Sequence, residues 1–373
     1  MGNQTNYRPT KAVIDLQAIK HNITSLKHYL QPHVTIIAVV KANAYGHGDI
    51  EVAKAAIQAG ATMLAVATPD EAVHMRAHFK EIDILVLGAT PTSFIPYASE
   101  GNITLTVFST EWLEQAQPLI PLSRNVKIHL KIDSGMGRIG MASKEELLAV
   151  SEIVSNSDQF IVDGIFTHFA TADEEDTLYF DKQVYIFKEL LEVLPKKPRL
   201  VHVANTATAL VKDPSLQYDA VRFGISMYGL VPSSYVEGIL PFPLKPAFAL
   251  ETELIHVKQL KAGQSVGYGA AFTAEHDCFI GTIPIGYADG MIRKLSGQDV
   301  LIGGERAKII GRICMDQSMI LLPKAYTVGE RVTLIGRQHE DQITLDDWAF
   351  KLDTINYEVP CVITSRVPRI YIK

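Results

Sequence analysis

Apolar and amphipathic stretches alternate along the first 240 residues of the chain. The apolar stretches are short and rich in Val, Ile and Leu, which is typical of strands buried on both faces of a parallel sheet. The amphipathic stretches between them often open with Ser, Thr, Pro or Asp, residues that favour the start of a helix. Strands are predicted at residues 35–40, 63–68, 83–88, 104–108, 126–133, 160–168, 199–205 and 220–225, and helices at 15–30, 69–79, 110–119, 143–154 and 176–194.

This alternation predicts the fold class. Eight strands separated by helix-like stretches favour an α/β fold with an N-terminal (β/α)8 barrel of the TIM type. An open, doubly wound parallel sheet is the alternative, because periodicity alone carries no sign of barrel closure.

The pattern changes at a proline cluster formed by Pro241, Pro243 and Pro246. Beyond it, glycine-containing turn signals separate short β-prone stretches such as "SVGYGAAF" and "VLIGGERAKIIGR", which predicts an all-β domain. We therefore assign residues 1–240 to the barrel and 241–373 to a C-terminal β domain, which residues 1–10 could also join.

Composition narrows the class of function. The 373 residues are 47% hydrophobic and 20% charged, as in ordinary globular proteins, and the net charge of −6 offers no basic surface for nucleic acid. No apolar stretch is long enough to span a bilayer, "MGNQTNYRPT" lacks the core of a signal peptide, and Asn6 stands where N-myristoylation requires Ser or Thr. Three cysteines without metal-ligand spacing predict no metal site and fit a reducing, cytoplasmic location.

Polar residues fall at the ends of several predicted strands, where barrel enzymes carry their chemistry. Lys41 follows the first strand, Arg138 the fifth, His168 and Asp173 the sixth and Thr206 the seventh, and Arg222 lies on the eighth with Gly224 and Ile225 beyond it. Each has a plain structural interpretation by itself: a solvated strand end, a core histidine, a helix cap or a turn.

The combination favours a cofactor site. A lysine on a rigid strand end can form a Schiff base. Thr206, Gly224 and Ile225 follow the two strands after which barrel enzymes commonly bind phosphate, and backbone N–H groups at a helix start would hold it there. A Schiff-base lysine and a phosphate cradle at one barrel mouth together predict a site for pyridoxal phosphate (PLP).

Eight motifs carry a resemblance to a known family. In order, they are "VVKANAYGHG", "KIDSGMGRIG", "THFATAD", "HVANTAT", "RFGISMYG", "SVGYGAAF", "IPIGYADG" and "GRICMDQ". They closely resemble the motifs of bacterial alanine racemases, and the resemblance covers nearly the whole chain. It implies a PLP-dependent homodimer of fold type III that interconverts L- and D-alanine, supplies D-alanine for peptidoglycan and shares its active sites between subunits.

The resemblance also implies roles for individual residues. Lys41 would bind PLP and act as the base on the D face, and Tyr268 from the second subunit would be the base on the L face. The cofactor would be bound by Lys41, Tyr45, Arg138, His168, Thr206, Arg222, Gly224, Ile225 and Tyr357, the substrate by Arg138 and Met315, and the entrance corridor lined by Asp173, Tyr287, Arg293 and Arg312. Thr206 departs from the serine of the family pattern but keeps the hydroxyl.

Two of these roles raise chemical requirements. A tyrosine is a poor base at neutral pH, so Tyr268 needs a nearby cation, for which the arginines are candidates. Arg222 would face the pyridine nitrogen, with His168 and His202 behind it. An arginine can only donate hydrogen bonds, so that nitrogen should stay unprotonated.

Other functions stay open. A related PLP-dependent decarboxylase typically places a carboxylate opposite the pyridine nitrogen, which Arg222 argues against. A racemase of serine or of a broader amino-acid range is a closer alternative, and a non-catalytic PLP-binding protein is a third. Some family members carry a carbamate on a lysine at the position of Lys131, which would place an anion near Arg138.

Overall fold

The computed structural model describes residues 7–373, which form two compact bodies. The barrel body consists of Ala18–Ala44 and Asp49–Pro246. The β body consists of 7–17, Tyr45–Gly48 and Ala247–Lys373. Residues 7–10 belong to the β body, and residues 1–6 lie outside the described residues.

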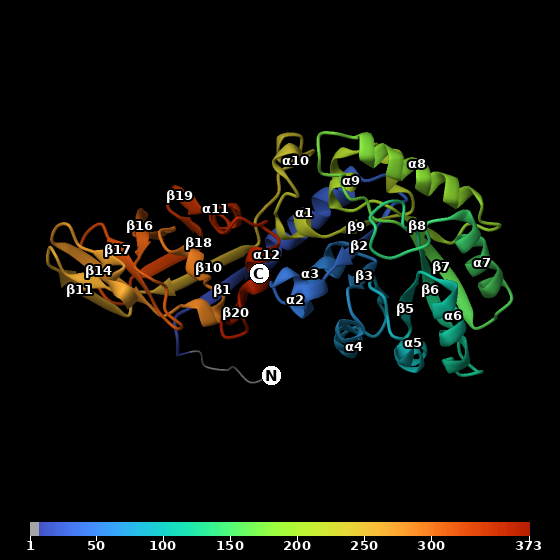
Figure 1. The fold of residues 1–373 in the computed structure, drawn as a ribbon, viewed down its shortest axis with the longest axis horizontal. Coiled ribbons are helices and arrows are strands. Elements are labelled where there is room, and N and C mark those ends of the chain that lie inside the picture. The colour runs from blue at the N-terminus through green and yellow to red at the C-terminus, as the bar shows by residue number, and fades with distance from the viewer. Residues whose placement is uncertain (1–6) are drawn as a thin grey trace. The chain divides into compact units, whose positions relative to one another are not determined.

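Eight parallel strands form the sheet of the barrel body, in the order β8-β7-β6-β5-β4-β3-β2-β9 (Figure 1). Two backbone hydrogen bonds link the segments that contain its first and last strands, from Asp219 N–H to Val201 O at 3.1 Å and from Arg222 N–H to Ala204 O at 2.9 Å. The predicted barrel is therefore confirmed. Its strands are β2 (Thr35–Val39), β3 (Met63–Val66), β4 (Asp83–Val86), β5 (Ile103–Val107), β6 (Val126–Lys131), β7 (Phe160–Phe166), β8 (Leu200–His202) and β9 (Ala220–Phe223).

Helices follow most of these strands, and local capping explains where several begin. Thr68 and Ser143 form capping boxes with Glu71 and Glu146, which satisfy the first N–H groups of α4 and α7. The helices predicted from sequence are present. The helices of the barrel body are α1 (Leu16–Tyr29), α3 (Asp49–Ala59), α4 (Pro69–His78), α5 (Ile95–Gly101), α6 (Thr110–Ala116), α7 (Lys144–Ser155), α8 (Leu178–Glu192), α9 (Thr206–Val211) and α10 (Ser234–Gly238).

A ten-stranded sheet forms the β body, in the order β11-β14-β17-β16-β15-β18-β10-β1-β20 with β19 paired to β18. The strand β1 (Lys11–Asp15) pairs antiparallel with β10 and parallel with β20, so both ends of the described chain enter one sheet. The other elements are β10 (Phe248–Glu253), β11 (His256–Leu260), β12 (Ser265–Val266), β13 (Phe272–Thr273), β14 (Cys278–Ile283), β15 (Asp299–Ile302), β16 (Glu305–Ile310), β17 (Ser318–Leu322), β18 (Arg331–Gln338), β19 (Asp341–Ile343), α11 (Leu345–Leu352), α12 (Glu358–Val362) and β20 (Arg369–Ile372).

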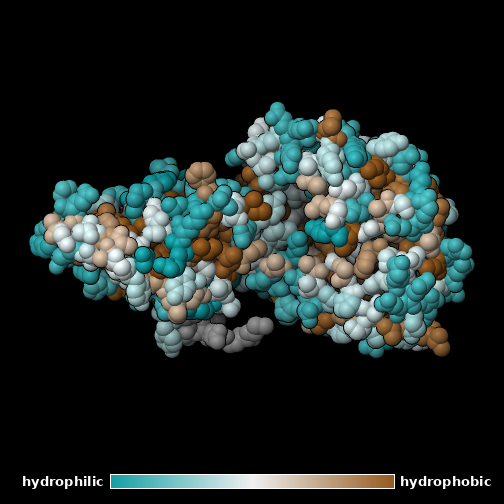
Figure 2. All heavy atoms as spheres, in the orientation of Figure 1, coloured by the Kyte–Doolittle hydropathy of each residue, from teal (hydrophilic) through white to brown (hydrophobic). Residues whose placement is uncertain are grey.

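The molecular surface drawn in Figure 2 intermixes hydrophilic and hydrophobic residues. Within residues 7–373, none of the helices has the length and apolar character needed to cross a membrane.

Candidate active site

A left-handed turn follows the first barrel strand and carries Lys41 at its start. The segment α2 (Lys41–Tyr45) has φ near 52° at Ala42 and the three residues after it, a conformation that costs about 1–2 kcal/mol per non-glycine residue. Glu71 holds the turn, because its carboxylate accepts the Ala42 N–H at 2.7 Å and the Ala67 N–H at 2.8 Å. Strain of this kind persists only where surrounding contacts fix it, and it is common at functional sites.

Arg222 is buried inside the barrel with a nearly complete set of acceptors. Its Nη1 bonds to His202 Nδ1 at 2.9 Å and to His202 O at 2.5 Å. Its Nη2 donates to Thr167 O at 2.7 Å and to Val203 O at 3.0 Å. A guanidinium has five N–H groups, and the Nε–H of Arg222 has no acceptor among the described residues. That one donor is left for a ligand.

Two histidines extend the contacts of Arg222 into the barrel. His202 Nε2 bonds to His129 Nδ1 at 2.8 Å, and both rings are fully buried. His129 Nε2 lies 3.4 Å from Asp163 Oδ2, and Arg199 donates to both oxygens of that carboxylate at 2.8 Å. Sequence reasoning placed His202 behind Arg222 but missed His129, Asp163 and Arg199, because nothing in three separate strand segments indicates that they meet.

The segments after the seventh and eighth barrel strands meet at Thr206. Its buried hydroxyl accepts the Gly224 N–H at 3.0 Å. The cap of α9 is Asn205, whose side chain accepts the Thr208 N–H at 3.0 Å, so Thr206 is not the helix cap. Ile225 follows as the first residue of the 3-10 turn η4 (Ile225–Tyr228). The structure thus brings Thr206 and Gly224 into contact, with Ile225 next in the chain.

The turn after the fifth barrel strand is shaped by Asp133, which sequence reasoning also missed. Its carboxylate accepts the N–H groups of Gly135 at 2.9 Å, Gly137 at 3.0 Å and Arg138 at 3.2 Å. Burial alone would raise the pKa of Asp133, but these backbone hydrogen bonds outweigh it and lower that pKa. The Arg138 side chain is exposed at this turn.

Cations crowd the same region of the barrel. Lys131 ends β6 and is buried, with Nζ 5.0 Å from the centre of the Phe166 ring. Burial, and next the Arg222 charge, lower the pKa of Lys131 to about 7. Burial and the nearby Arg138 lower the pKa of Arg222 to about 9, which leaves it charged at neutral pH. Burial and Arg222 also lower the pKa of His168, which favours a neutral ring.

Tyr268 lies in the β body and is 70% exposed. It opens the 3-10 turn η5 (Tyr268–Ala270), which follows β12. A Cβ built on the neighbouring Gly269 would come within 3.2 Å of Arg312 Nη1. The Arg312 guanidinium therefore lies against the turn that carries Tyr268.

Two loops of the β body are tied together beside Met315. The N–H of Tyr287 donates to Cys314 O and that of Ala288 to Met315 O, both at 3.0 Å. Gly286 makes this approach possible, since a Cβ there would lie 2.3 Å from Met315 O. Tyr287 and Met315 are 43% and 53% exposed.

Two further predicted cofactor ligands come together in the β body. The rings of Tyr45 and Tyr357 lie 6.2 Å apart between centres. Burial, and next the nearby Cys361, raise the pKa of Tyr45, so its hydroxyl keeps its proton and can donate to an anion. Gly46 packs against the Pro360 carbonyl, where a Cβ would come within 2.0 Å.

The predicted site residues thus divide between the two bodies. The barrel body holds Lys41, Lys131, Arg138, His168, Asp173, Thr206, Arg222, Gly224 and Ile225, and the β body holds Tyr45, Tyr268, Tyr287, Arg293, Arg312, Met315 and Tyr357.

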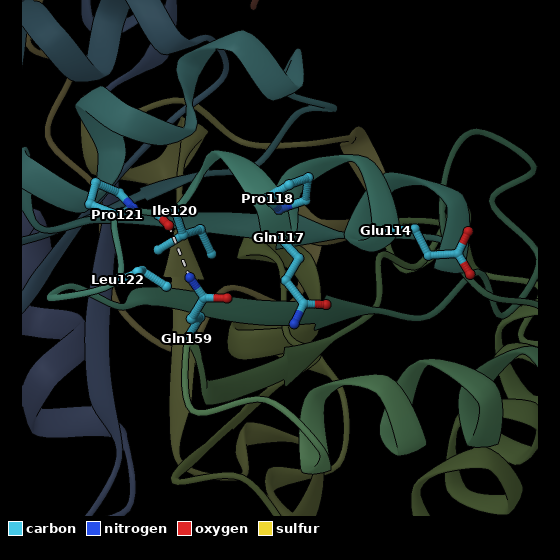
Figure 3. Close-up of a pocket in the computed structure, with 7 residues that line it drawn as sticks. All are labelled: Glu114, Gln117, Pro118, Ile120, Pro121, Leu122 and Gln159. Carbon is cyan, nitrogen blue, oxygen red and sulfur yellow. Dashed lines mark hydrogen bonds between the residues drawn. The ribbon is translucent and has the colours of Figure 1, made fainter.

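A surface hollow of about 560 Å³ lies elsewhere on the barrel body (Figure 3). It is lined by Glu114, Gln117, Pro118, Ile120, Pro121, Leu122 and Gln159. Several of these residues come shortly before β6 and β7, at the N-terminal ends of the strands, whereas barrel enzymes react at the C-terminal ends. None of the predicted site residues lines it.

Comparison with known proteins tests the resemblance found in the sequence. Residues 14–232 match the family model "Alanine racemase, N-terminal domain", and residues 247–371 match "Alanine racemase, C-terminal domain". An alanine racemase of Anoxybacillus flavithermus is 51% identical over 98% of this chain and 96% of its own length.

Solved structures agree with the family models. An alanine racemase from Bacillus anthracis with bound L-Ala-P is 44% identical, with a TM-score of 0.96 over 99% of this chain and 96% of that chain. A histidine racemase from Leuconostoc mesenteroides is 36% identical, with a TM-score of 0.92 over 99% of both chains. Because two family models and a relative with half of its residues identical span nearly the whole chain, the chain belongs to the alanine racemase family.

Proposed function

We propose that the protein is a PLP-dependent racemase that interconverts L- and D-alanine with Lys41 and Tyr268 as its two bases. The observation that carries the proposal is the donor set of Arg222. Four hydrogen bonds use its Nη groups and leave the Nε–H for a ligand acceptor, in a buried site beside other cations.

The residues of the barrel body fit PLP. The Nε–H of Arg222 suits an unprotonated pyridine nitrogen, which accepts a hydrogen bond. Thr206, Gly224 and Ile225 would hold the phosphate, and Tyr45 and Tyr357 of the β body would add hydroxyl donors. When bound, PLP supplies an electron sink for the charge left on the α-carbon of the amino acid.

The chain's own residues would move the protons. The Lys41 amine would take or return the α-proton on the D face, and the Tyr268 hydroxyl would do so on the L face. Bases on both faces allow inversion without turning the amino acid over. Arg312 lies against the turn that carries Tyr268. Arg138 and the Met315 N–H would orient the substrate carboxylate, and Asp173, Tyr287, Arg293 and Arg312 would line the corridor to it.

Lys41 can be tested directly. Borohydride reduction of the purified protein, followed by peptide mapping, should leave a phosphopyridoxyl label on Lys41. A label on a different lysine would contradict the assignment. Formation of D-alanine from L-alanine tests the activity itself.

Arg222 separates the proposed racemase from a PLP-dependent decarboxylase. Because arginine cannot accept a hydrogen bond, Arg222 would favour an unprotonated pyridine nitrogen, and the bound cofactor would then be a weaker electron sink with fewer side reactions. The variant Arg222→Glu should racemise more slowly and transaminate more, as measured by pyruvate release. An unchanged partition between the two reactions would contradict this role.

Alanine is the proposed substrate, and the amino-acid range is open to measurement. The histidine racemase from Leuconostoc mesenteroides has the same fold, so the fold alone leaves the side-chain pocket undetermined. Rates of racemisation of L-alanine, L-serine and L-histidine, measured by chiral chromatography, should be fastest for alanine. If L-serine or L-histidine reacts faster than L-alanine, that amino acid is the preferred substrate and the proposal for alanine is wrong.

We also infer that each active site is shared by two copies of the chain. Tyr268 and Met315 are 70% and 53% exposed, although both would have to touch a substrate in a closed site. A two-fold dimer would cover such residues and give two equivalent sites.

Hybrid dimers test this inference. The inactive variants Lys41→Ala and Tyr268→Ala are mixed and allowed to exchange subunits. With shared sites, a hybrid dimer has one intact site, so random mixing should restore roughly a quarter of wild-type activity. A mixture that stays inactive although mass spectrometry detects hybrids would falsify the shared site.

Lys131 is proposed to be carbamylated. Its pKa of about 7 makes the neutral amine available near neutral pH, and that amine can attack carbon dioxide and pass its proton to solvent. The resulting anion would replace repulsion by attraction toward the Arg138 and Arg222 charges. Labelling with ¹³C-bicarbonate should give a carbamate signal that Lys131→Met lacks. Active enzyme without the signal would contradict the modification.

The cellular role follows from the product. D-alanine is a building unit of peptidoglycan, and a cytoplasmic location would give the enzyme access to PLP and to L-alanine. A D-alanine requirement of cells deprived of the protein would support this role, and normal growth without D-alanine would oppose it.

A further inference from the structure

A chain of hydrogen bonds in the barrel runs in one direction from a group that can only donate to a group that can only accept. Arg222 donates to His202 Nδ1 at 2.9 Å, so that nitrogen is unprotonated and the ring proton sits on Nε2. The Nε2–H of His202 then donates to His129 Nδ1 at 2.8 Å. His129 in turn carries its proton on Nε2 and directs it to the Asp163 carboxylate at 3.4 Å.

Charge and burial agree with these tautomers. Burial lowers the pKa of His202 and of His129, so both rings are neutral at neutral pH. Burial alone would raise the pKa of Asp163, but hydrogen bonds from His129 and Arg199 outweigh it and lower that pKa, so the carboxylate is charged. A protonated His202 would point a second N–H at the Arg222 guanidinium, and two donors facing each other form no hydrogen bond.

A β-bulge in the backbone at Asp163 brings its side chain to His129. The pairing of β6 with β7 shifts register between Ile128 and His129, so that Ile128 faces Val162 whereas His129 faces Gly164. Asp163 is the extra residue of this bulge, a feature that commonly redirects a side chain near an active site.

Gly164 makes room for the ring that Asp163 contacts. A Cβ on Gly164 would lie 2.7 Å from two atoms of the His129 ring, closer than such atoms approach. The Arg199 guanidinium grips both oxygens of Asp163 at 2.8 Å and fixes the carboxylate from the opposite side. The contact between Asp163 and His129 is thus supported by the β-bulge, by the space at Gly164 and by the bidentate hydrogen bonds from Arg199.

We propose that Asp163 is a positioning residue for Arg222: through His129 and His202 it fixes the tautomers that let Arg222 donate its Nη1–H into the barrel and keep its Nε–H for the ligand. The role of the Arg222 Nε–H toward a ligand rests on the proposed function. The tautomers of His129 and His202 follow from the hydrogen bonds alone.

The consequence of losing Asp163 follows from the donor-to-acceptor direction of these hydrogen bonds, which runs from Arg222 to Asp163. Without the carboxylate, the Nε2–H of His129 has no acceptor and its proton can move to Nδ1. That nitrogen would then face the Nε2–H of His202 as a donor, and His202 could respond by moving its own proton to Nδ1. Arg222 would lose one of its four acceptors and with it a fixed orientation.

Ring-nitrogen NMR of the full-length holoenzyme tests the tautomers. With ¹⁵N-labelled histidine, and with His129→Gln and His202→Gln to assign signals, wild type should show both rings neutral and protonated on Nε2. The variant Asp163→Ala should show His129 at least partly protonated on Nδ1. Asp163→Asn keeps an acceptor oxygen and should restore the wild-type pattern. Should Asp163→Ala fail to fold, Asp163→Leu, which also lacks an acceptor for the Nε2–H of His129 but fills more of the space, takes its place with the same expected result.

The second measurement asks whether the tautomers matter to the reaction. Asp163→Ala should lower kcat roughly tenfold, the scale typical of a partner that orients a ligand-binding group, with KM little changed and a shifted cofactor absorbance band. Lys127→Met, which breaks the Lys127–Asp83 ion pair, is the matched control and should leave kcat, the absorbance band and the tautomers unchanged.

Two results would overturn the proposal. Ring signals that are the same in Asp163→Ala and wild type would remove the link between Asp163 and the histidines. Altered tautomers with unchanged kcat and cofactor absorbance would remove the link to Arg222. A wild-type protein without racemase activity would instead contradict the proposed function, since the ring spectra test the hydrogen-bond chain by themselves.

Discussion

The predicted site residues of the barrel body and of the β body are held in different ways. In the barrel body, Arg222 and Thr206 are buried, and the Nη groups of Arg222 and the hydroxyl of Thr206 are bonded to neighbouring strands and loops. In the β body, Tyr268 and Met315 are 70% and 53% exposed, and the glycines beside them keep the loops close together.

This difference determines whether a substitution should change stability together with activity or activity alone. The barrel residues take their positions from the same contacts that stabilise the barrel, so changing one should affect folding and activity together. The β-body residues need another surface to complete their surroundings, so changing one should affect activity while leaving the isolated fold intact.

The largest expected effect is on activity, at Tyr268. Tyr268→Phe removes the hydroxyl that would carry a proton and should lower kcat by about 10²–10⁴-fold. Because the side chain is 70% exposed, the free energy of unfolding should change by less than about 0.5 kcal/mol. Tyr185→Phe, at a side chain that is 64% exposed on α8, should leave both quantities unchanged. A large loss of stability in Tyr268→Phe would break the comparison.

Substitution of Arg222, unlike that of Tyr268, should lower the free energy of unfolding measured in urea. Arg222→Leu leaves the His202 ring and three backbone carbonyls of the barrel without their donor and should destabilise the protein by about 3–5 kcal/mol, besides reducing activity. Arg306→Leu, which removes an exposed pair with Asp341, should cost under about 1 kcal/mol. Equal losses in the two variants would mean that burial does not distinguish these arginines.

The pH dependence of stability sharpens the comparison within the barrel. The pKa of Lys131 is about 7 in the folded protein, against about 10.4 in an unfolded chain. Between these values only the unfolded state binds the proton, so this residue's contribution makes stability rise with pH from about 7 to about 10. Below pH 7 the full penalty is present, because both the folded and the unfolded state then bind the proton.

Lys131→Met should therefore be more stable than wild type below pH 7, in buffer free of carbon dioxide, and the difference should shrink toward pH 10. Urea unfolding at several pH values measures it. Lys127→Met, on the same strand but partly exposed, should show no such trend. A constant difference between Lys131→Met and wild type across this range would contradict a lysine that titrates near pH 7.

The smallest expected effect concerns the turn that carries Lys41. Glu71→Gln keeps one acceptor oxygen and loses the other, so either the Ala42 or the Ala67 N–H goes unpaired. We expect a loss of about 1–2 kcal/mol in unfolding and a measurable fall in kcat. Glu51→Gln breaks an exposed ion pair with Lys54 and should change neither. Unaltered kcat in Glu71→Gln would mean that the turn does not position Lys41.

Much of the fold was predictable because it depends on local patterns. A strand buried on both faces must be apolar along its length, and a helix needs a cap and an amphipathic stripe, so each element could be read from its own residues. The eight barrel strands and five of the helices were found in this way. Lys41 and Thr206 were identified because each follows a strand, and barrel topology brings all such positions to one end.

The tertiary structure decided what depends on distant residues. Asp163 and His129 lie 34 positions apart, and a bulge brings them together, which no alternation of apolar and polar residues predicts. The left-handed turn at Ala42 exists because Glu71, 29 positions away, accepts its N–H. The sequence by itself determined the elements and their order, since propensity and burial act locally. Only the folded chain determined which polar groups satisfy one another, because a buried donor takes whichever acceptor the packing brings within 3 Å or so.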